Sequence, residues 1–234
     1  MDFALTEEQN MMRQTVKTFA EKEVKPIAAE IDVTDEFPRD LFQKAGELGL
    51  LAINFPETYG GSGADTVTAA LASMEVGRVS AAVANIFSSV RHHLFCLYHY
   101  GTEEQKLKYM PRMARGEIIG SFALSESGSG SDAASIKTQA RPDGDEYVIN
   151  GSKNFITLGP VADFTILFAV TDESKKAKGI SAFIVEKGTP GFNVGRKEKK
   201  LGQKGNPVSE LIFADCRVPK SNMLGAEGEG LKIA

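Results

Sequence analysis

A serine- and glycine-rich stretch in the middle of the chain, Ala123–Ser135, has residue types that bind phosphate. Its sequence is ALSESGSGSDAAS, and it continues the apolar segment that begins at Phe122. Gly128 and Gly130 allow the backbone to turn its N–H groups to one side, and the neighbouring serine hydroxyls add donors. The composition alone is also typical of a flexible linker. The stretch therefore predicts either a site for a phosphate or pyrophosphate group or a linker.

Other catalytic or metal-binding arrangements are weaker in this sequence. A Rossmann fingerprint would need a third glycine and a surrounding βαβ unit, and no Walker A motif or nucleophile elbow occurs. The three histidines, His92, His93 and His99, could form a metal cluster with Cys96 at three- and four-residue spacing on a helix. Neighbouring histidines point to different faces of a helix, so polar packing or an interface is the favoured interpretation. No metal site is therefore predicted.

Composition and charge are those of an ordinary globular protein. The 234 residues are 42% hydrophobic and 25% charged, with a formal net charge of −4. No basic excess is present to recruit nucleic acid or an anionic membrane. Two distant cysteines, Cys96 and Cys216, indicate a reducing compartment, and a single disulfide between them stays open as an alternative. The acidic start of the chain, MDFALTEEQNMM, and the lack of a membrane-length apolar run predict a soluble cytoplasmic protein.

The first half of the chain has the pattern of a helical bundle. Capping boxes of sequence TEEQ begin at Thr6 and Thr102, and apolar residues at helical spacing follow the first one. Proline and glycine mark helix ends, with Pro26 as an interruption. The expected helices lie after Thr6 and at residues 38–48, 64–77, 81–100 and 103–116.

From Ile118 onward the sequence favours short β-strands. Asn150-Gly151, between two strand-like runs, predicts a two-residue hairpin turn. Further strand-like runs lie at 164–170, 180–185 and 210–213. Their spacing predicts an antiparallel sheet or barrel rather than alternating β and α units. The predicted fold class is α+β, an all-helical bundle at residues 1–117 followed by an antiparallel β-barrel-like domain at 118–228, with a short stub at 229–234.

Two stretches, Phe122–Ser135 and Asn150–Thr157, resemble the signature motifs of the acyl-CoA dehydrogenase family. The first has the order small residue, Leu, Ser or Thr, Glu, two free positions and then Ser/Gly-Gly-Ser-Asp. The second, NGSKNFIT, follows at the expected distance. Further family-like stretches occur at 54–61, 100–105, 200–205 and 215–219, so the resemblance covers essentially the whole chain in unbroken order. It favours the binding loop over the linker.

The resemblance implies a helical N-terminal domain, a β-barrel-like middle domain and a helical C-terminal domain that is absent from these 234 residues. It also implies FAD as cofactor, acyl-CoA as substrate, an electron-transferring flavoprotein as partner and a homotetramer in the full-length form. The implied activity is oxidation of the Cα–Cβ bond of an acyl-CoA thioester to trans-2-enoyl-CoA, in fatty acid metabolism.

Family positions carried over residue by residue imply a flavin site in the second half of the chain. The backbone of Leu124 and the hydroxyl of Ser125 would bond the pyrimidine end of the isoalloxazine. Ser131 would bond the pyrophosphate and touch the thioester chain, and the Thr157 hydroxyl would lie at the flavin N5. The implied cofactor residues are Phe122, Leu124, Ser125, Gly130, Ser131, Phe155, Ile156 and Thr157, and the implied substrate residues are Ser131 and Ser88.

Three positions depart from the common family pattern. Phe155 stands where Trp or Tyr is usual, and its ring still offers a face for packing on the flavin but no hydrogen bond. Ser127 replaces a frequent proline, and Leu158 replaces a frequent asparagine. The last two changes remove no ligand group that the resemblance implies.

The catalytic base implied by the family is a glutamate of the C-terminal domain, so no catalytic residue is predicted in this sequence. The chain ends in GLKIA, where a new helix begins, which indicates a truncated protein that binds FAD weakly and is inactive alone. Two alternatives stay open: a flavin oxidase or monooxygenase of the same fold, and a non-catalytic module that binds acyl-CoA or a partner. The basic run Arg196–Lys200 with Lys204 meets either the phosphates of coenzyme A or solvent.

Overall fold

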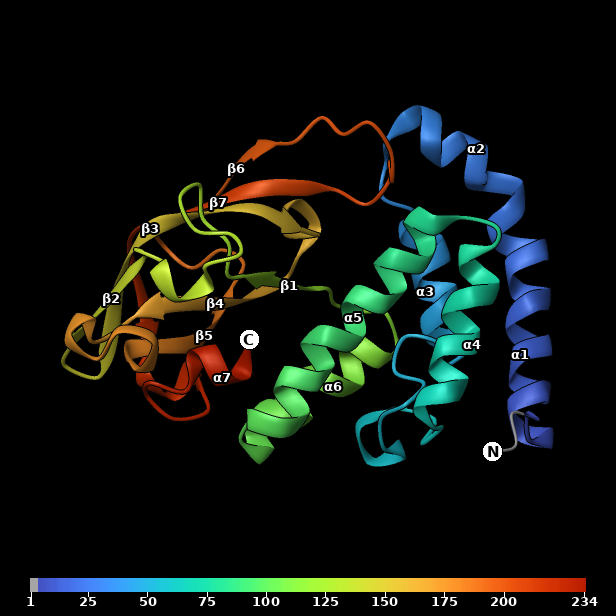
Figure 1. The fold of residues 1–234 in the computed structure, drawn as a ribbon, viewed down its shortest axis with the longest axis horizontal. Helices are drawn as coiled ribbons and strands as arrows, with labels where there is room; N and C mark the ends of the chain where they lie inside the picture. Colours follow the sequence, from blue (N-terminus) through green and yellow to red (C-terminus); the bar gives the residue numbers. More distant parts are fainter. Residues whose placement is uncertain (1–3) are drawn as a thin grey trace. The chain divides into compact units, whose positions relative to one another are not determined.

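The computed structural model describes residues 4–234, which form two compact units. The helical unit contains the chain up to Leu94 together with Leu107–Ile118 and Lys200–Asn206. The β unit contains Phe95–Lys106, Ile119–Lys199 and Pro207–Ala234. Figure 1 labels the helices and strands of both units. No helix in the described part of the chain is long and apolar enough to cross a membrane.

The two predicted capping boxes form at helix starts. Thr6 Oγ1 accepts from the backbone N–H of Gln9 (3.2 Å), and the Gln9 side chain accepts from the backbone N–H of Thr6 (3.0 Å). Thr102 and Gln105 form the second predicted capping box in the same way. The longer helices are α1 (Glu7–Phe19), α2 (Lys25–Thr34), α3 (Arg39–Glu47), α4 (Thr66–Gly77), α5 (Ala81–Tyr100) and α6 (Glu103–Ala114).

A π-helical turn, Ala20–Val24, joins α1 to α2. The sequence predicts an interruption at Pro26, but the backbone stays helical from α1 to α2. Proline lacks an N–H and cannot continue the i→i−4 hydrogen bonds, but the π-helical turn directly before it, closed by the Lys25 N–H on the Ala20 carbonyl, already shifts that pattern. Pro26 therefore sits where it is tolerated, and the interruption is a change of helical type rather than a break.

Aromatic side chains from three helices meet in the interior of the helical unit. Phe42 of α3 is fully buried, and its ring centroid lies 6.5 Å from that of Phe87 on α5. The ring of Phe19 on α1 lies 6.4 Å from Phe87. The other largest fully buried side chains of this unit are Leu51, Ile53, Ile86, Leu94, Met110 and Met113. Removal of this apolar surface from water is the main stabilising contribution to the bundle.

The described part of the β unit contains an eight-stranded sheet in the order β6-β7-β3-β2-β4-β5-β8, with β1 paired to β4. All neighbours are antiparallel except β1–β4 and one residue pair of β2–β4. The order has ends at β6 and β8, so the sheet is not a closed barrel. The predicted α+β class is confirmed. The strands are β1 (Gly120–Ala123), β2 (Gln139–Asp143), β3 (Glu146–Thr157), β4 (Phe164–Val170), β5 (Ile180–Glu186), β6 (Phe192–Lys197), β7 (Val208–Pro219) and β8 (Met223–Leu224), and the short helix α7 (Gly230–Ile233) lies beside β5.

The predicted hairpin turn at Asn150-Gly151 is wrong, because β3 continues through both residues. Gly151 has φ +149°, and a Cβ there would lie 2.5 Å from Thr138 Oγ1, so the site needs glycine for close approach rather than for a turn. Asn150 exchanges hydrogen bonds of 3.0 and 2.8 Å with Asp215. The turn between β2 and β3 is formed instead by Gly144 and its successor, between the last residue pair of the two strands.

The interior of the β unit combines a packed apolar core with one buried charge. Phe183 is fully buried, and its ring contacts Tyr147 edge to face at 5.0 Å between centroids. Phe122 and Phe168 meet at 4.7 Å. Lys153 is also fully buried, which is rare for a lysine and requires a partner.

Candidate functional site

The serine-glycine stretch folds as a tight turn directly after β1. Glu126 and Ser129 exchange two backbone hydrogen bonds of 2.9 and 3.1 Å, so the two residues between them form the tip of the turn. The Ser129 hydroxyl donates to the carbonyl of Asp132 at 2.5 Å. These contacts order the backbone, as a binding loop requires and a linker does not. We call residues Leu124–Ser131 the cradle.

A buried ion pair holds the cradle against β3. The Lys153 Nζ donates to the carbonyl of Leu124 (2.9 Å) and to Glu126 Oε1 (2.8 Å). The Glu126 carboxylate also accepts from the backbone N–H groups of Lys137 (2.7 Å) and Thr138 (2.9 Å). Burial lowers the pKa of Lys153 to about 8, and Glu126 partly offsets this. Burial raises the pKa of Glu126, but hydrogen bonds from Lys153 and Thr138 outweigh it and leave that pKa below its ordinary value.

Within the cradle, four of the eight backbone carbonyls accept hydrogen bonds from the protein, and most backbone N–H groups are free. The carbonyls that accept a hydrogen bond are those of Leu124, Ser125, Glu126 and Ser129. No residue in the described structure accepts from the backbone N–H groups of Ser125, Ser127, Gly128, Gly130 and Ser131. The cradle therefore presents a set of donors, which suits a ligand rich in hydrogen-bond acceptors.

Near the end of β3, an exposed aromatic residue directly follows a residue that is hydrogen-bonded to the cradle. The backbone N–H of Asn154 donates to the carbonyl of Ser125 at 2.9 Å, and Phe155 follows directly. The pairing of β3 with β7 is irregular between Lys153 and Ile156, and Phe155 lies there with φ +60° and is 67% exposed. Irregularities of this kind re-aim side chains and are frequent at binding sites. The Phe155 ring is thus available to a planar ligand.

The remaining predicted site residues are distributed over both units. Phe122, on β1, is partly buried, and Thr157 is half-buried at the end of β3. Ile156 is buried in the core, so only its backbone is available to a ligand. Ser88 lies on α5 in the helical unit, where its hydroxyl donates to carbonyls of its own helix at 2.9 and 3.2 Å. The structure brings the cradle and the end of β3 together, and the role of each residue in binding stays a prediction.

Leu158 is one of the departures from the family pattern, and its surroundings accommodate it. It adopts φ +62°, a backbone conformation that asparagine tolerates better than leucine. Its side chain is fully buried, and its N–H donates to the carbonyl of Pro207 at 2.7 Å. Packing and this hydrogen bond compensate for the unfavourable conformation.

Sequence reasoning gave no role to Glu126 or Lys153, although both lie within the family-like motifs. The signal was present in the strand pattern. Tyr147 and Ile149 are buried positions of β3, and Lys153 continues the same alternation. A lysine at an inward position of a strand implies a buried carboxylate partner.

The histidines and cysteines do not form a reactive centre. His93 is buried, and burial lowers its pKa to about 3, whereas His92 and His99 are exposed. Among residues 4–234, no group of three or more His, Cys, Asp or Glu side chains could hold a metal ion. Cys96 and Cys216 are free, buried thiols, and burial raises the pKa of each to about 11, so neither is activated as a nucleophile.

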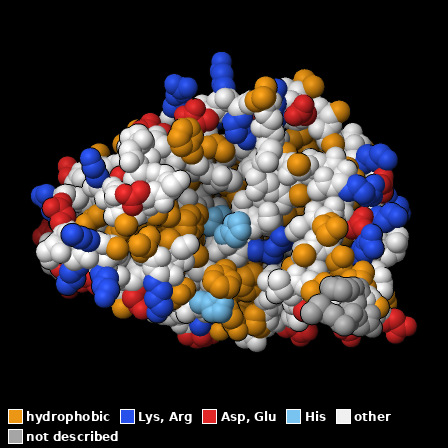
Figure 2. All heavy atoms as spheres, in the orientation of Figure 1, with side chains coloured by type: hydrophobic (Ala, Val, Ile, Leu, Met, Phe, Trp, Pro, Cys, Tyr) orange, Lys and Arg blue, Asp and Glu red, His pale blue; other side chains and the backbone are white. Residues whose placement is uncertain are grey.

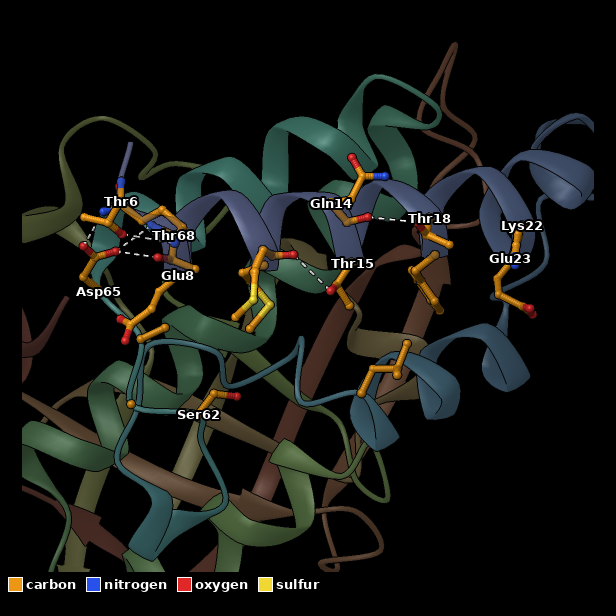
Figure 3. Close-up of a pocket in the computed structure, with 17 residues that line it drawn as sticks. Thr6, Glu8, Gln14, Thr15, Thr18, Lys22, Glu23, Ser62, Asp65 and Thr68 are labelled. Atoms are coloured by element: carbon orange, nitrogen blue, oxygen red, sulfur yellow. Dashed lines mark hydrogen bonds between the residues drawn. The ribbon is translucent and has the colours of Figure 1, made fainter. Parts of the chain in front are cut away.

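A separate groove of about 1220 Å³ runs along α1 within the helical unit (Figure 3). Exposed apolar side chains line it, including Met11 and Leu48, which are 67% and 50% exposed. The hydroxyls of Thr15 and Thr18 on this helix donate to carbonyls one turn earlier, at 3.0 and 2.9 Å. None of the predicted cofactor or substrate residues lines the groove.

Charged side chains of both signs lie on the surface of the described chain. On the face drawn in Figure 2, basic and acidic side chains are interspersed over both units. In the basic run, Arg196 pairs with Glu198 at 3.6 Å. Lys200 donates to the carbonyls of Gln203 and Asn206, each at 2.6 Å. These contacts give part of the run a structural role.

Comparisons with known proteins identify relatives of both halves of the chain. The family model "Acyl-CoA dehydrogenase, N-terminal domain" matches residues 6–117, and "Acyl-CoA dehydrogenase, middle domain" matches residues 121–216. The short-chain specific acyl-CoA dehydrogenase of Clostridium acetobutylicum is 48% identical over 100% of this chain and 62% of its own length. The acryloyl-CoA reductase (NADH) of Anaerotignum propionicum is 48% identical over 100% of this chain and 60% of its own.

Solved structures agree. Butyryl-CoA dehydrogenase from Megasphaera elsdenii superposes with a TM-score of 0.94 at 41% identity, over 100% of this chain and 62% of that one. A structure described with the electron transferring flavoprotein of Acidaminococcus fermentans gives 0.96 at 46% identity, and the FAD complex of PigA gives 0.95 at 31%; each covers 100% of this chain and 62% of the other. The chain thus spans about three fifths of the length of the relatives it matches. It belongs to the acyl-CoA dehydrogenase family, of which it contains the N-terminal and middle domains.

Proposed function

We propose that the whole protein containing this chain is an FAD-dependent dehydrogenase that oxidises the Cα–Cβ bond of a short-chain acyl-CoA to the trans-2-enoyl-CoA. The observation that carries the proposal is the row of free backbone donors in the cradle, beside the exposed ring of Phe155. The names of the relatives support the substrate class, since they include a short-chain acyl-CoA dehydrogenase and a butyryl-CoA dehydrogenase.

The groups in the cradle fit FAD by their chemistry. The isoalloxazine of the cofactor is a flat ring system whose pyrimidine end carries two carbonyl acceptors, and the pyrophosphate supplies further acceptor oxygens. The free N–H groups of the cradle match the acceptors, and Phe155 offers a face for the ring. The residues we assign to the cofactor are Phe122, Leu124, Ser125, Gly130, Ser131, Phe155, Ile156 through its backbone, and Thr157.

The chain's own residues bind and orient rather than carry out proton transfer. When bound, FAD supplies the two-electron acceptor for the reaction. Ser125 and Thr157 hydroxyls orient the ring, Ser131 bonds the pyrophosphate and the thioester chain, and Ser88 lines the acyl site. The α proton, made acidic by the thioester carbonyl, is taken by a glutamate from the part of the relatives' length that this chain does not span. The N-terminal and middle domains contribute to the reaction by aligning the reacting C–H bond.

The identity of the redox partner sets the direction and the class of the reaction. We assign an electron-transferring flavoprotein as the partner, supported by the structural neighbour described with one. A relative named acryloyl-CoA reductase (NADH) runs the opposite direction on an enoyl-CoA. Dehydrogenase and flavin oxidase differ only in whether oxygen accepts the electrons. We further propose a cytoplasmic homotetramer, with domain boundaries at residues 117/118 and 228/229.

The test of the proposed function uses the natural full-length protein. We expect it to purify with flavin absorbance or to take up added FAD, and to reduce an artificial electron acceptor when given butyryl-CoA. Oxygen consumption in place of acceptor reduction would assign an oxidase instead. Absence of flavin together with failure to take up FAD would refute the proposal.

Replacing Gly130 by leucine is expected to weaken FAD binding without unfolding the protein. A Cβ at Gly130 meets no atom within 4 Å, so the flavin-free protein should keep its stability to within about 0.5 kcal/mol. The leucine side chain would occupy the space where a ligand approaches the backbone, and we expect the FAD dissociation constant to rise about tenfold or more. Fluorescence titration with FAD and thermal unfolding measure the two effects.

Gly202 provides the matched control for Gly130. It too has open space around its Cβ position, and it lies outside the cradle. Gly202→Leu should leave both stability and FAD affinity unchanged. Equal FAD affinity in the Gly130→Leu variant would remove Gly130 from the binding site.

A further inference from the structure

The buried pair of Lys153 and Glu126 is the most unusual feature of the β unit. The Lys153 side chain is fully buried and that of Glu126 is 10% exposed, with 2.8 Å between Nζ and Oε1. Buried ion pairs of this kind seldom add stability over apolar residues of similar size. Their presence is therefore better explained by what they hold in place.

Lys153 controls the direction of one peptide group. Its Nζ donates a hydrogen bond to the carbonyl of Leu124, which is the first residue of the cradle. In a trans peptide, the C=O and the following N–H point in opposite directions, and no cis peptide occurs in the described chain. The N–H of Ser125 therefore points away from the Lys153 ammonium, and it is one of the donors that no protein group uses.

Glu126 connects the cradle to a second segment. Its two carboxylate oxygens accept from the backbone N–H groups of Lys137 and Thr138, just before β2. Its own backbone forms the closing pair of the turn with Ser129. The pair thus joins β3, the cradle and the segment before β2, with Lys153 and Thr138 buried and the Lys137 contact at the surface.

We propose that Lys153 and Glu126 are positioning residues for the flavin: by holding the Leu124 carbonyl inward and tying the turn to the segment before β2, they aim the free N–H groups of the cradle at the cofactor and set the FAD affinity. The inference rests on the proposed function. Neither side chain touches the cofactor, because Lys153 is fully buried and Glu126 is satisfied by Lys153 and two backbone amides. Their action is on the backbone that binds it.

The test compares two lysine variants of the natural full-length protein. Lys153→Met removes the hydrogen bond to Leu124 while keeping an unbranched side chain of similar size, and Glu126 retains both backbone donors. Lys175→Met is the control, because Lys175 also pairs with a carboxylate (Asp172, 2.9 Å) in the β unit but is exposed. We expect the FAD dissociation constant to rise about tenfold or more in Lys153→Met and to stay unchanged in the control.

Three further readouts separate positioning from a purely structural role. The flavin-free variants should unfold cooperatively, as the unchanged protein does. Glu126→Gln, which keeps an acceptor oxygen, should retain more of the FAD affinity than Glu126→Ala. Hydrogen exchange of the Asn154 backbone N–H, which donates to Ser125, should speed up in Lys153→Met in the absence of FAD, because Lys153 no longer holds the neighbouring Leu124 carbonyl.

The pH dependence of FAD affinity provides a signature of Lys153 itself. Its pKa of about 8 means that it loses its proton as the pH rises from 7 to 9, and Glu126 is the ionisable group that acts on it. The unchanged protein should therefore bind FAD more weakly at pH 9 than at pH 7, and Lys153→Met should lack this step. If the unchanged protein binds no FAD, the proposed function fails. If it binds FAD and Lys153→Met binds equally well with the same pH profile, the positioning role alone is overturned.

Discussion

Replacing Phe183 by alanine is expected to lower the free energy of unfolding of the β unit by about 3–5 kcal/mol. Phe183 is fully buried on β5 and contacts Tyr147 at 5.0 Å, so truncation loses both apolar burial and the edge-to-face contact. Domains of this kind have a total stability of about 5–15 kcal/mol, so the loss is a large fraction. The chain has no tryptophan, and urea unfolding followed by circular dichroism is the suitable measurement.

Phe155→Ala in the same unit is the matched comparison, with the opposite outcome. Phe155 is 67% exposed, so its truncation should change the stability of the flavin-free protein by no more than about 0.5 kcal/mol. Its effect should fall on FAD binding, through loss of the ring face. A stability loss equal to that of Phe183→Ala would mean that the Phe155 ring is packed inside the flavin-free protein, contrary to the structure.

Replacing Glu126 by alanine is expected to destabilise the protein by about 3–5 kcal/mol at pH 7. The change leaves the Lys153 ammonium in the interior with the carbonyl of Leu124 as its only hydrogen-bond partner among the described residues. It also leaves the N–H groups of Lys137 and Thr138 without their acceptor. Lys153→Met should cost less, because the Glu126 carboxylate that remains keeps its two backbone N–H donors and is partly exposed.

The loss in Glu126→Ala should be smaller at pH 9 than at pH 7. The pKa of Lys153 in the folded protein, about 8, lies below its ordinary value of 10.5, so between these values the unfolded chain binds more protons than the folded one. Stability therefore rises with pH in this window, and removing Glu126 extends the window downward because Glu126 is the group that raises this pKa. Urea midpoints at both pH values measure the effect. An unchanged urea midpoint for Glu126→Ala at pH 7 would contradict the predicted destabilisation.

Helix positions could be predicted from the sequence because their signals are local. The capping boxes at Thr6 and Thr102 each lie within four residues, and both form as expected. The error at Pro26 concerns only the type of helical turn. Local hydrogen bonding decides these features, so no knowledge of distant contacts was needed.

The sheet and the site depended on contacts that a sequence does not display. Asn150-Gly151 has the residues of a hairpin turn, but its backbone is fixed by Asp215 and Thr138, which are distant in sequence. The parallel pairing of β1 with β4 is equally non-local. The motif residues pointed to the cradle through a resemblance. The sequence does not show which carbonyls of the cradle accept hydrogen bonds from the protein and which N–H groups stay free. These features depend on the partners of Lys153 and of the cradle backbone in the folded structure.

The donors of the cradle belong to the main chain. Each residue of the cradle is therefore restricted mainly in the size of its side chain and by the need for a backbone N–H, and less in its identity. Side chains along it can drift among small residues over evolution while the donors persist. Proline is the exception, since it has no N–H to offer. The resemblance to the family places Ser127 where proline is frequent, and serine keeps the main-chain N–H that proline would remove.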